Sequence, residues 1–221
     1  MTARAPGTGI DTVVVIAKEP LAGAVKTRLV PPLTHEQAAD VAAAALWDTL
    51  RAVATVPAAD RLLAFAGDPR HWAPEGWRTA PQPDGDLDTR LVAAFRAAGP
   101  GPAVLVGMDT PQLRAEQLAA FDPTRFDACL GRATDGGYWA IGFADPRHAA
   151  AAITGVPMST DHTGADQLVR LRELGLQVQL LDDLTDVDTV DTAAEVARLV
   201  PHSAFAAAFA RCGVGRPDRV G

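Results

Sequence analysis

The stretch that decides the fold reads TVVVIAKEPLAGAVKTRLVPPL and covers residues 12–33. Its first part, 12–17, is a continuous apolar and largely β-branched run, which is typical of a strand buried on both faces. A loop with glycine and proline follows and ends in Lys-Thr-Arg at 26–28. Ligands of open α/β sheets bind outside the carboxyl ends of the strands, so this loop is positioned to bind phosphate. The alternative is a surface loop with solvated basic residues.

Composition indicates one globular α/β domain. The chain has 221 residues, of which 48% are hydrophobic, and this is ample for a core. Its net charge of −7 disfavours general nucleic-acid binding, so any polyanionic ligand has to meet a local basic patch, best provided by residues 18–28. The two cysteines, Cys129 and Cys212, form no metal spacing or disulfide framework. With no evident signal peptide or membrane span, we expect a cytoplasmic protein.

Apolar runs and helical patterns alternate along the rest of the chain. Strands are predicted at 61–66, 103–107, 127–131, 138–143 and 176–181, with a short edge strand near Trp77. Helices are predicted from the capping box Thr34–Gln37 to Pro57, from Asp86 to Gly99, from Pro111 to about Ala120, and at 164–174 and 189–200. This order predicts a mostly parallel sheet in a layered fold. We expect a disordered N-terminus at 1–9, a single domain at 10–200, and a C-terminal helix with a flexible tail at 201–221.

Asp109 is the strongest single candidate for a catalytic or metal-binding residue. It follows the apolar run at 103–107 and therefore lies at the carboxyl end of a predicted strand, on the same edge of the sheet as Lys26. A carboxylate beside a phosphate-binding loop suits a bridging cation, and Mg²⁺ prefers one or two carboxylates together with phosphate oxygens and water. The alternative is a helix cap or turn before Pro111, since proline is favoured at the first helical position.

Four aspartates lie within residues 182–188, after the last predicted strand. Asp188 directly precedes a predicted helix, which makes it either a second metal ligand or an ordinary N-cap. Asp182 and Asp183 are expected in a solvated turn. The role of Asp186 stays open.

Two other polar stretches are candidates for ligand binding. In D-G-G-Y-W at 135–139, two glycines permit close approach of a ligand and an aromatic ring can stack on a base or sugar. The alternative is a tight turn before a strand whose aromatic residues enter the core. In S-T-D-H at 159–162, His162 is either a general base or a loop residue with no catalytic role.

Five blocks taken in order resemble a bacterial family of glycosyltransferase-like proteins, long catalogued as of unknown function. They are A-K-x-P-x-x-G-x-V-K-T-R-L at 17–29, Q-P-D-G-D-L-D-T-R-L at 82–91, V-G-M-D-T-P at 106–111, G-R-A-T-D-G-G-Y at 131–138 and D-V-D-T at 186–189. Some relatives carry an arsenosugar-biosynthesis label, and the superfamily includes 2-phospho-L-lactate and molybdenum-cofactor guanylyltransferases. The resemblance implies a GT-A-like fold with a mixed sheet.

The resemblance also implies roles for individual residues. It implies nucleotide binding by Ala17, Lys18, Gly23, Lys26, Thr27, Arg28 and Gln82. It implies acceptor binding by Asp135, Gly136, Gly137, Tyr138, Ser159, Thr160 and His162. Asp109 and Lys26 would be catalytic, and Asp109 and Asp188 would bind Mg²⁺ or Mn²⁺. The chain departs from the family at Met158, where relatives have Trp, and at Asp88-Thr89, where they tend to have Gly-Glu.

Three functions agree with these residues. The leading one is a metal-dependent glycosyltransferase that moves sugar from a nucleotide-diphosphate sugar to a small-molecule acceptor. The second is a guanylyl- or cytidylyltransferase that joins an NTP to a phosphorylated small acid or cofactor and releases pyrophosphate. The three cations Lys18, Lys26 and Arg28 suit the triphosphate of this second reaction. The third is a non-catalytic nucleotide-binding protein on the same scaffold. No nucleic-acid or membrane partner is expected.

Overall fold

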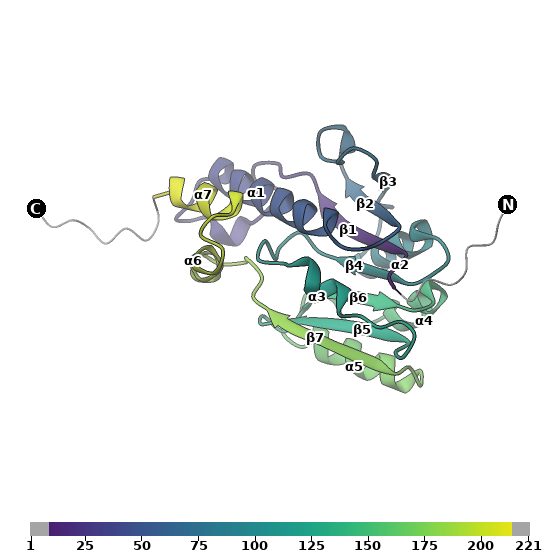
Figure 1. Cartoon of the computed structure of the whole chain (residues 1–221). Coiled ribbons are helices and arrows are strands. Elements are labelled where there is room, and N and C mark those ends of the chain that lie inside the picture. The colour runs from purple at the N-terminus through teal and green to yellow at the C-terminus, as the bar shows by residue number, and fades with distance from the viewer. Residues whose placement is uncertain (1–8, 214–221) are drawn as a thin grey trace, which may run out of the picture.

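The β-branched run near the start of the chain forms the middle of the sheet. In the computed structural model, which describes residues 9–213, β1 (Thr12–Lys18) pairs in parallel with β2 (Asp60–Ala66) and β4 (Ala103–Val106). Residues 13–15 are fully buried because helices cover both faces. The order of the seven strands is β3-β2-β1-β4-β6-β5-β7 (Figure 1). The other strands are β3 (Arg78–Pro81), β5 (Ala128–Ala133), β6 (Tyr138–Phe143) and β7 (Val178–Leu184).

Strand β6 runs against the direction of its neighbours. It pairs antiparallel with β4 and with β5, whereas β7 pairs in parallel with β5 at the sheet edge. The amino end of β6 therefore lies at the same edge as the carboxyl ends of β4 and β5. The mixed, mostly parallel sheet confirms the predicted fold class.

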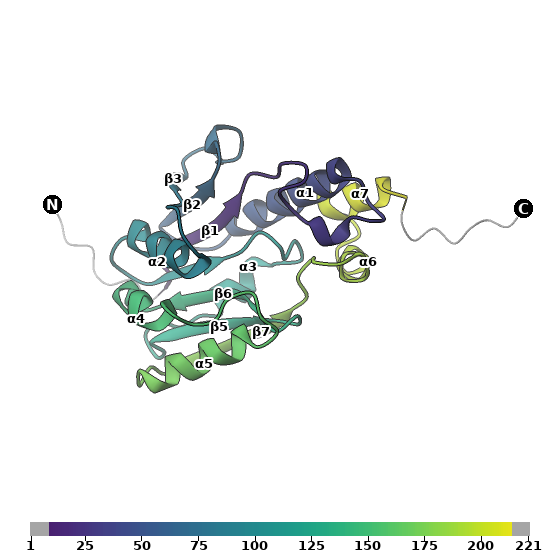
Figure 2. The same cartoon turned by 180° about the vertical axis from the view of Figure 1, so that it is seen from behind.

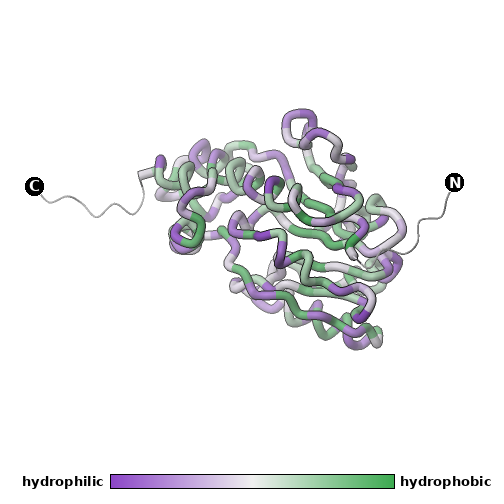
Figure 3. The backbone as a smooth tube through the Cα atoms, viewed as in Figure 1, coloured by the Kyte–Doolittle hydropathy of each residue, from purple (hydrophilic) through white to green (hydrophobic). Residues whose placement is uncertain are grey.

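Helices cover the sheet on both faces. Helices α1 (His35–Ala54) and α3 (Ala115–Ala119) pack on one face with Val13 and Val15. On the other face, seen toward the viewer in Figure 2, lie α2 (Leu87–Ala98), α4 (Ala149–Ile153) and α5 (Thr163–Glu173). The hydropathy colouring places apolar residues mainly along the central strands (Figure 3). This is the pattern of a three-layer core.

The last two helices pack away from the sheet. Helix α6 (Val190–Leu199) and α7 (Ala204–Arg211) pack on the outer side of α1 around Phe205 and Phe209. Asp48 of α1 fixes α7, since its carboxylate accepts hydrogen bonds from the backbone N–H groups of Ala204 and Phe205. The division into one domain at 10–200 with a C-terminal helix and tail stays a prediction. Of the ends expected to be disordered or flexible, at 1–9 and 201–221, residues 1–8 and 214–221 lie outside the described residues.

The predicted helix starts are partly right. Thr34 and Gln37 form the capping box of α1 as predicted. The start predicted at Pro111 is wrong, because α3 begins at Ala115 after Arg114 as N-cap. Asp86 occupies the N-cap position of α2, but its side chain makes no capping hydrogen bond. Within residues 9–213, no helix has the length and apolar character that a membrane span requires.

Candidate functional site

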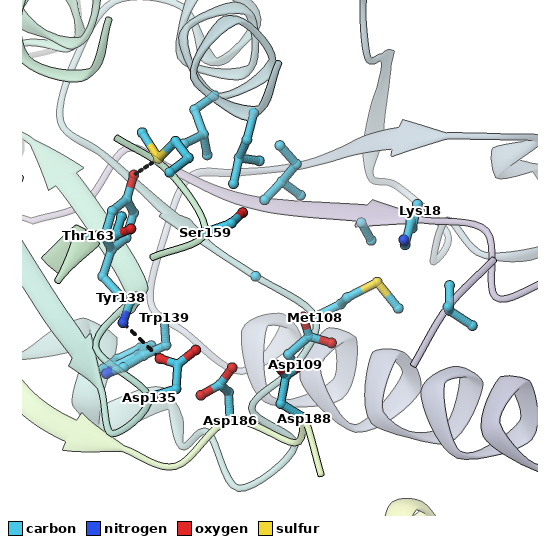
Figure 4. Close-up of a pocket in the computed structure, with 18 of the residues that line it drawn as sticks. Lys18, Met108, Asp109, Asp135, Tyr138, Trp139, Ser159, Thr163, Asp186 and Asp188 are labelled. Carbon is cyan, nitrogen blue, oxygen red and sulfur yellow. Dashed lines mark hydrogen bonds between the residues drawn. The ribbon is translucent and has the colours of Figure 1, made fainter. Parts of the chain in front are cut away.

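A cavity of about 710 Å³ lies at the edge of the sheet where β1 and β4 end (Figure 4). Its wall on one side is formed by the end of β1 and by residues 25–28. The opposite wall is formed by the start of β6 and by the loop 158–163. The segments 107–109 and 186–188 supply the aspartates between them. Because β6 is reversed, residues that precede it in the sequence reach the same cavity as residues that follow β1 and β4.

Lys26 is a buried ammonium group in this cavity. Its Nζ lies 2.6 Å from Asp109 Oδ1 and 3.5 Å from Asp188 Oδ1, and its side chain is only 6% exposed. Burial alone would lower the pKa of Lys26, but Asp109 and Asp188 outweigh it, so the pKa lies above its ordinary value. Lys26 is therefore not the solvated basic residue of a surface loop that the alternative interpretation assumed.

Neither Asp109 nor Asp188 caps a helix, although Asp109 does lie in a bend before Pro111. Helix α3 begins well after Asp109, and α6 is capped by Thr189, whose hydroxyl accepts from the N–H of Thr192. Asp188 instead binds Arg28, with 2.5 Å between Arg28 Nη1 and Asp188 Oδ2. Both aspartates thus have their side chains in the cavity, paired with cations.

Asp186, whose role the sequence leaves open, completes a group of carboxylates. Ligand oxygens of Asp135, Asp186 and Asp188 all lie within 4.8 Å of one another, and Figure 4 shows these side chains in a row with Asp109. Oδ1 of Asp186 is buried and has no hydrogen-bond partner among the described residues. Burial, followed by the charges of Asp135 and Asp188, raises the pKa of Asp186 to about 6. Three clustered carboxylates with one unpartnered oxygen fit a hard divalent cation.

The two loops after β4 and β7 are tied together beneath these carboxylates. The backbone N–H of Val187 donates to the carbonyl of Asp109 at 2.9 Å. The buried amide of Gln112 donates to the carbonyl of Thr185. These two contacts hold Asp109 and the 186–188 segment in register with each other.

Gly136 brings the two loops on the β6 side into contact. Its φ is +96°, and a Cβ at this position would lie 1.8 Å from the carbonyl oxygen of Asp161. Its own carbonyl accepts a hydrogen bond from Gly164 N–H at 2.8 Å, and Gly137 N–H donates to Asp135 Oδ1 at 2.8 Å. Only glycine fits at position 136, and its absence of a side chain lets residues 159–163 close against the turn before β6.

The loop 158–163 presents Ser159 and Thr160 to the cavity in a fixed conformation. Thr163 Oγ1 donates to the Pro157 carbonyl at 2.9 Å and accepts from Thr160 N–H at 3.0 Å. Ser159 has a φ of +60°, which is uncommon for a residue other than glycine. Tyr138 lies behind this loop with its hydroxyl 3.8 Å from the sulfur of Met158. The conformation of Ser159 is held in place by the hydrogen bonds of its neighbours.

Gln82 and Lys18 define the opposite end of the cavity. The Gln82 side-chain amide donates to the carbonyls of Ala17 (2.7 Å) and Ala64 (2.9 Å), which fixes it across the ends of β1 and β2. Lys18 Nζ donates to the carbonyl of Ala24 at 2.8 Å and so holds the loop that leads to Lys26. Gln82 and Lys18 both line the cavity.

Most residues expected in the site line this one cavity. Those that do are Ala17, Lys18, Lys26, Thr27, Arg28, Gln82, Asp109, Asp135, Gly137, Tyr138, Ser159, Thr160 and Asp188. Gly23, Gly136 and His162 do not, and His162 instead binds Asp161 and Asp166 on the surface. Sequence reasoning missed Arg90 and Leu87, which line the cavity from the first turn of α2. Their position inside the block at 82–91 was the available signal.

The fold is that of a structure described as a nucleotide-diphospho-sugar transferase candidate. A solved structure from Desulfovibrio desulfuricans G20, described as a candidate nucleotide-diphospho-sugar transferase, matches with a TM-score of 0.81 and 26% identity over 91% of this chain and 95% of that chain. The family model described as an uncharacterized protein conserved in bacteria (DUF2064) matches residues 40–160, so the chain belongs to this family. No curated protein matches the chain.

More distant structures share the fold alone. One is CMP:2-keto-3-deoxy-manno-octonic acid synthetase complexed with CTP, with a TM-score of 0.55 and 12% identity over 86% of this chain and 98% of that chain. Another is Rv0371c from Mycobacterium tuberculosis H37Rv in complex with manganese, with a TM-score of 0.52 and 18% identity over 85% and 98%.

Proposed function

We propose that this protein is a metal-dependent transferase with a nucleotide donor, and that the donor is a nucleotide-diphosphate sugar whose sugar passes to a small-molecule acceptor. The observation that carries the proposal is the meeting of Lys26 and Arg28 with Asp109, Asp186 and Asp188 at the carboxyl-end edge of the sheet. Fixed cations beside clustered carboxylates suit a phosphate–metal complex. The description of the Desulfovibrio protein supports the sugar donor.

The carboxylates would hold the metal. Asp135, Asp186 and Asp188 fit Mg²⁺ or Mn²⁺ because they offer oxygen ligands within 4.8 Å of one another. Asp109, ion-paired with Lys26, borders the same region and would share in binding. The presence of manganese in the Rv0371c structure agrees with this choice. When bound, such an ion stabilises negative charge that develops on a leaving diphosphate.

The chain's own groups would divide the substrates between the two walls of the cavity. Lys18, Lys26 and Arg28 would bind the phosphates, and positioning and charge neutralisation by such groups supply most of the catalysis in phosphate chemistry. The acceptor would lie against Tyr138, Ser159 and Thr160 on the opposite wall. The hydroxyls of Ser159 and Thr160 suit a hydroxylated acceptor because they both donate and accept hydrogen bonds.

Nucleotidyl transfer is the second candidate. Three cations at the β1 wall provide charge for a triphosphate, and the CTP-bound synthetase shares the fold. In that reaction an NTP is joined to a phosphorylated small acid or cofactor, and pyrophosphate leaves.

The products separate the two reactions. Protein with Mn²⁺ is incubated with NDP-sugars or with NTPs, in the presence of pools of hydroxylated and phosphorylated acceptors. Release of a nucleoside diphosphate from an NDP-sugar is expected. Pyrophosphate release from GTP or CTP, with no reaction of any NDP-sugar, would show the second candidate to be correct.

The Asp186→Asn variant is the control for contaminating activity, because it removes one metal-facing charge at nearly constant size. Product formation is expected to fall with this variant and to survive in Asp182→Asn, whose carboxylate is exposed outside the cavity. If the wild-type protein forms neither product but still binds nucleotide, the protein is a non-catalytic nucleotide-binding protein.

A further inference from the structure

The ammonium of Lys26 is ion-paired with carboxylates that the proposed metal ion would also bind. Its ammonium contacts Asp109 at 2.6 Å and Asp188 at 3.5 Å, and Asp188 is also one of the three residues that could hold a divalent ion. A dication at Asp188 and the ammonium of Lys26 therefore compete for the same negative charge. They would also repel each other at short range in a poorly solvated site.

Apart from Asp109 and Asp188, the anion that acts on the Lys26 charge is Asp186, which belongs to the same group of carboxylates that would hold the metal. The Lys26 side chain is 6% exposed, so an ammonium pushed away from the aspartates by a metal would be both desolvated and unpaired. This state is costly unless a new anion arrives. The phosphates of the donor are the anions that this wall of the cavity would bind in the proposed function.

We infer that Lys26 is a counter-cation for these carboxylates and keeps the metal ion from binding until the donor enters. The ammonium of Lys26 then pairs with the phosphates of the donor, and the carboxylates bind the metal ion. The inference rests on the proposed function. It makes metal and donor bind cooperatively, each raising the affinity for the other by the same factor. The free protein would then hold divalent ions weakly in spite of its clustered aspartates.

The test measures the affinity for Mn²⁺ alone, from the electron paramagnetic resonance signal of the free ion. Lys26→Met retains most of the length of the side chain and removes the charge. If Lys26 competes with the metal, this variant binds Mn²⁺ at least tenfold more tightly than the wild-type protein. Lys26→Gln, which is polar and uncharged, is expected to change the affinity in the same direction and guards against misfolding of the methionine variant. Thermal unfolding shows whether both variants are folded.

Lys18→Met is the matched control. Lys18 lines the same cavity, but its ammonium is bound to the Ala24 carbonyl and not to a carboxylate. Loss of its charge acts only at longer range, so the affinity for Mn²⁺ is expected to change by less than threefold. A similar gain in Lys18→Met and Lys26→Met would overturn the counter-cation role, because net charge alone would explain it.

The remaining outcomes distinguish the inference from the proposed function. Equal affinity for Mn²⁺ in the wild-type protein and in folded Lys26 variants would reject the inference and leave the metal site intact. Absence of Mn²⁺ binding in every protein, Lys26→Met included, would reject the metal site and with it the metal-dependent function. Tight binding by Lys26→Met that is lost in Lys26→Met/Asp188→Asn would support both.

Discussion

Two pairs of aspartates within residues 182–188 have opposite surroundings. Asp182 and Asp183 lie on β7 and are exposed, and Asp183 pairs with Arg132 across the sheet edge at 3.0 Å. Asp186 and Asp188 lie just beyond the strand, half-buried in the cavity, where Asp188 binds two cations and Asp186 has an unpartnered oxygen. The chemistry of an aspartate in this run is therefore decided by the point where the strand ends.

The largest expected effect comes from a substitution in the cavity pair. Asp188→Asn removes a charge that belongs to the metal-facing group and to two ion pairs. We expect the affinity for Mn²⁺ with nucleotide to fall at least a hundredfold, about 2.7 kcal/mol, as measured by calorimetry. Asp182→Asn is the control in the exposed pair and is expected to leave the affinity unchanged. Equal effects in both variants would remove the distinction between the two pairs.

A substitution at Gln112 tests which contacts fix residues 186–188 after β7. Replacement by leucine leaves the Thr185 carbonyl without its buried donor, just before Asp186. Loss of such a hydrogen bond costs about 2 kcal/mol, so the free energy of unfolding in urea should fall by this amount. The affinity for Mn²⁺ should fall with it, since the loop loses its register. Unchanged metal affinity would mean that the Asp109–Val187 backbone contact is sufficient.

Asp109 lies beside the cavity pair, and its substitution sharpens the comparison. Asp109→Asn is expected to lower metal-dependent nucleotide affinity at least tenfold, about 1.4 kcal/mol, because Lys26 loses its closest carboxylate and the metal loses a neighbouring charge. The measurement is nucleotide titration with and without Mn²⁺. If the metal dependence is the same as in the wild-type protein, Asp109 has no part in metal binding.

The smallest effect belongs to the exposed pair. In Asp183→Asn, the lost ion pair with Arg132 is about half exposed on both sides, and such pairs contribute roughly 0.2–1 kcal/mol. We expect a change in unfolding free energy of at most about 0.5 kcal/mol that shrinks further in 1 M NaCl. A larger loss in high salt would indicate that Asp183 has a packing role.

The fold was predictable where local patterns agree with the tertiary structure. The β-branched run at 12–17 and the capping box at Thr34 involve only neighbouring residues, and both lie where predicted. Strand β7 was predicted to end at 181, before its true end at Leu184, because its acidic residues resemble a turn. At an exposed sheet edge charged side chains are tolerated, and the strand continues through Asp183 to Leu184, past an irregularity that shifts its register with β5.

The location of the site at one edge of the sheet was predictable from the sequence, but the contacts between its side chains were not. Strand ends placed Asp109 and the Lys26 loop together, as the cavity shows. The burial of Lys26 depends on Asp109 and Asp188, which are far away in the sequence, so no local pattern reveals it. For the same reason the unpartnered oxygen of Asp186 could not be foreseen.

The reversal of β6 has a consequence for how such a cavity can change. The short turn at 134–137 between β5 and β6 delivers Asp135 and Tyr138 to one wall, while the other wall is built from β1 and its loop. The two walls therefore belong to separate stretches of chain. Insertions or deletions in the 158–163 loop would reshape one side of the cavity and leave the Lys26 loop and the end of β1 undisturbed. The cavity is in this sense modular, because the sequence of one wall can change while the other wall stays the same.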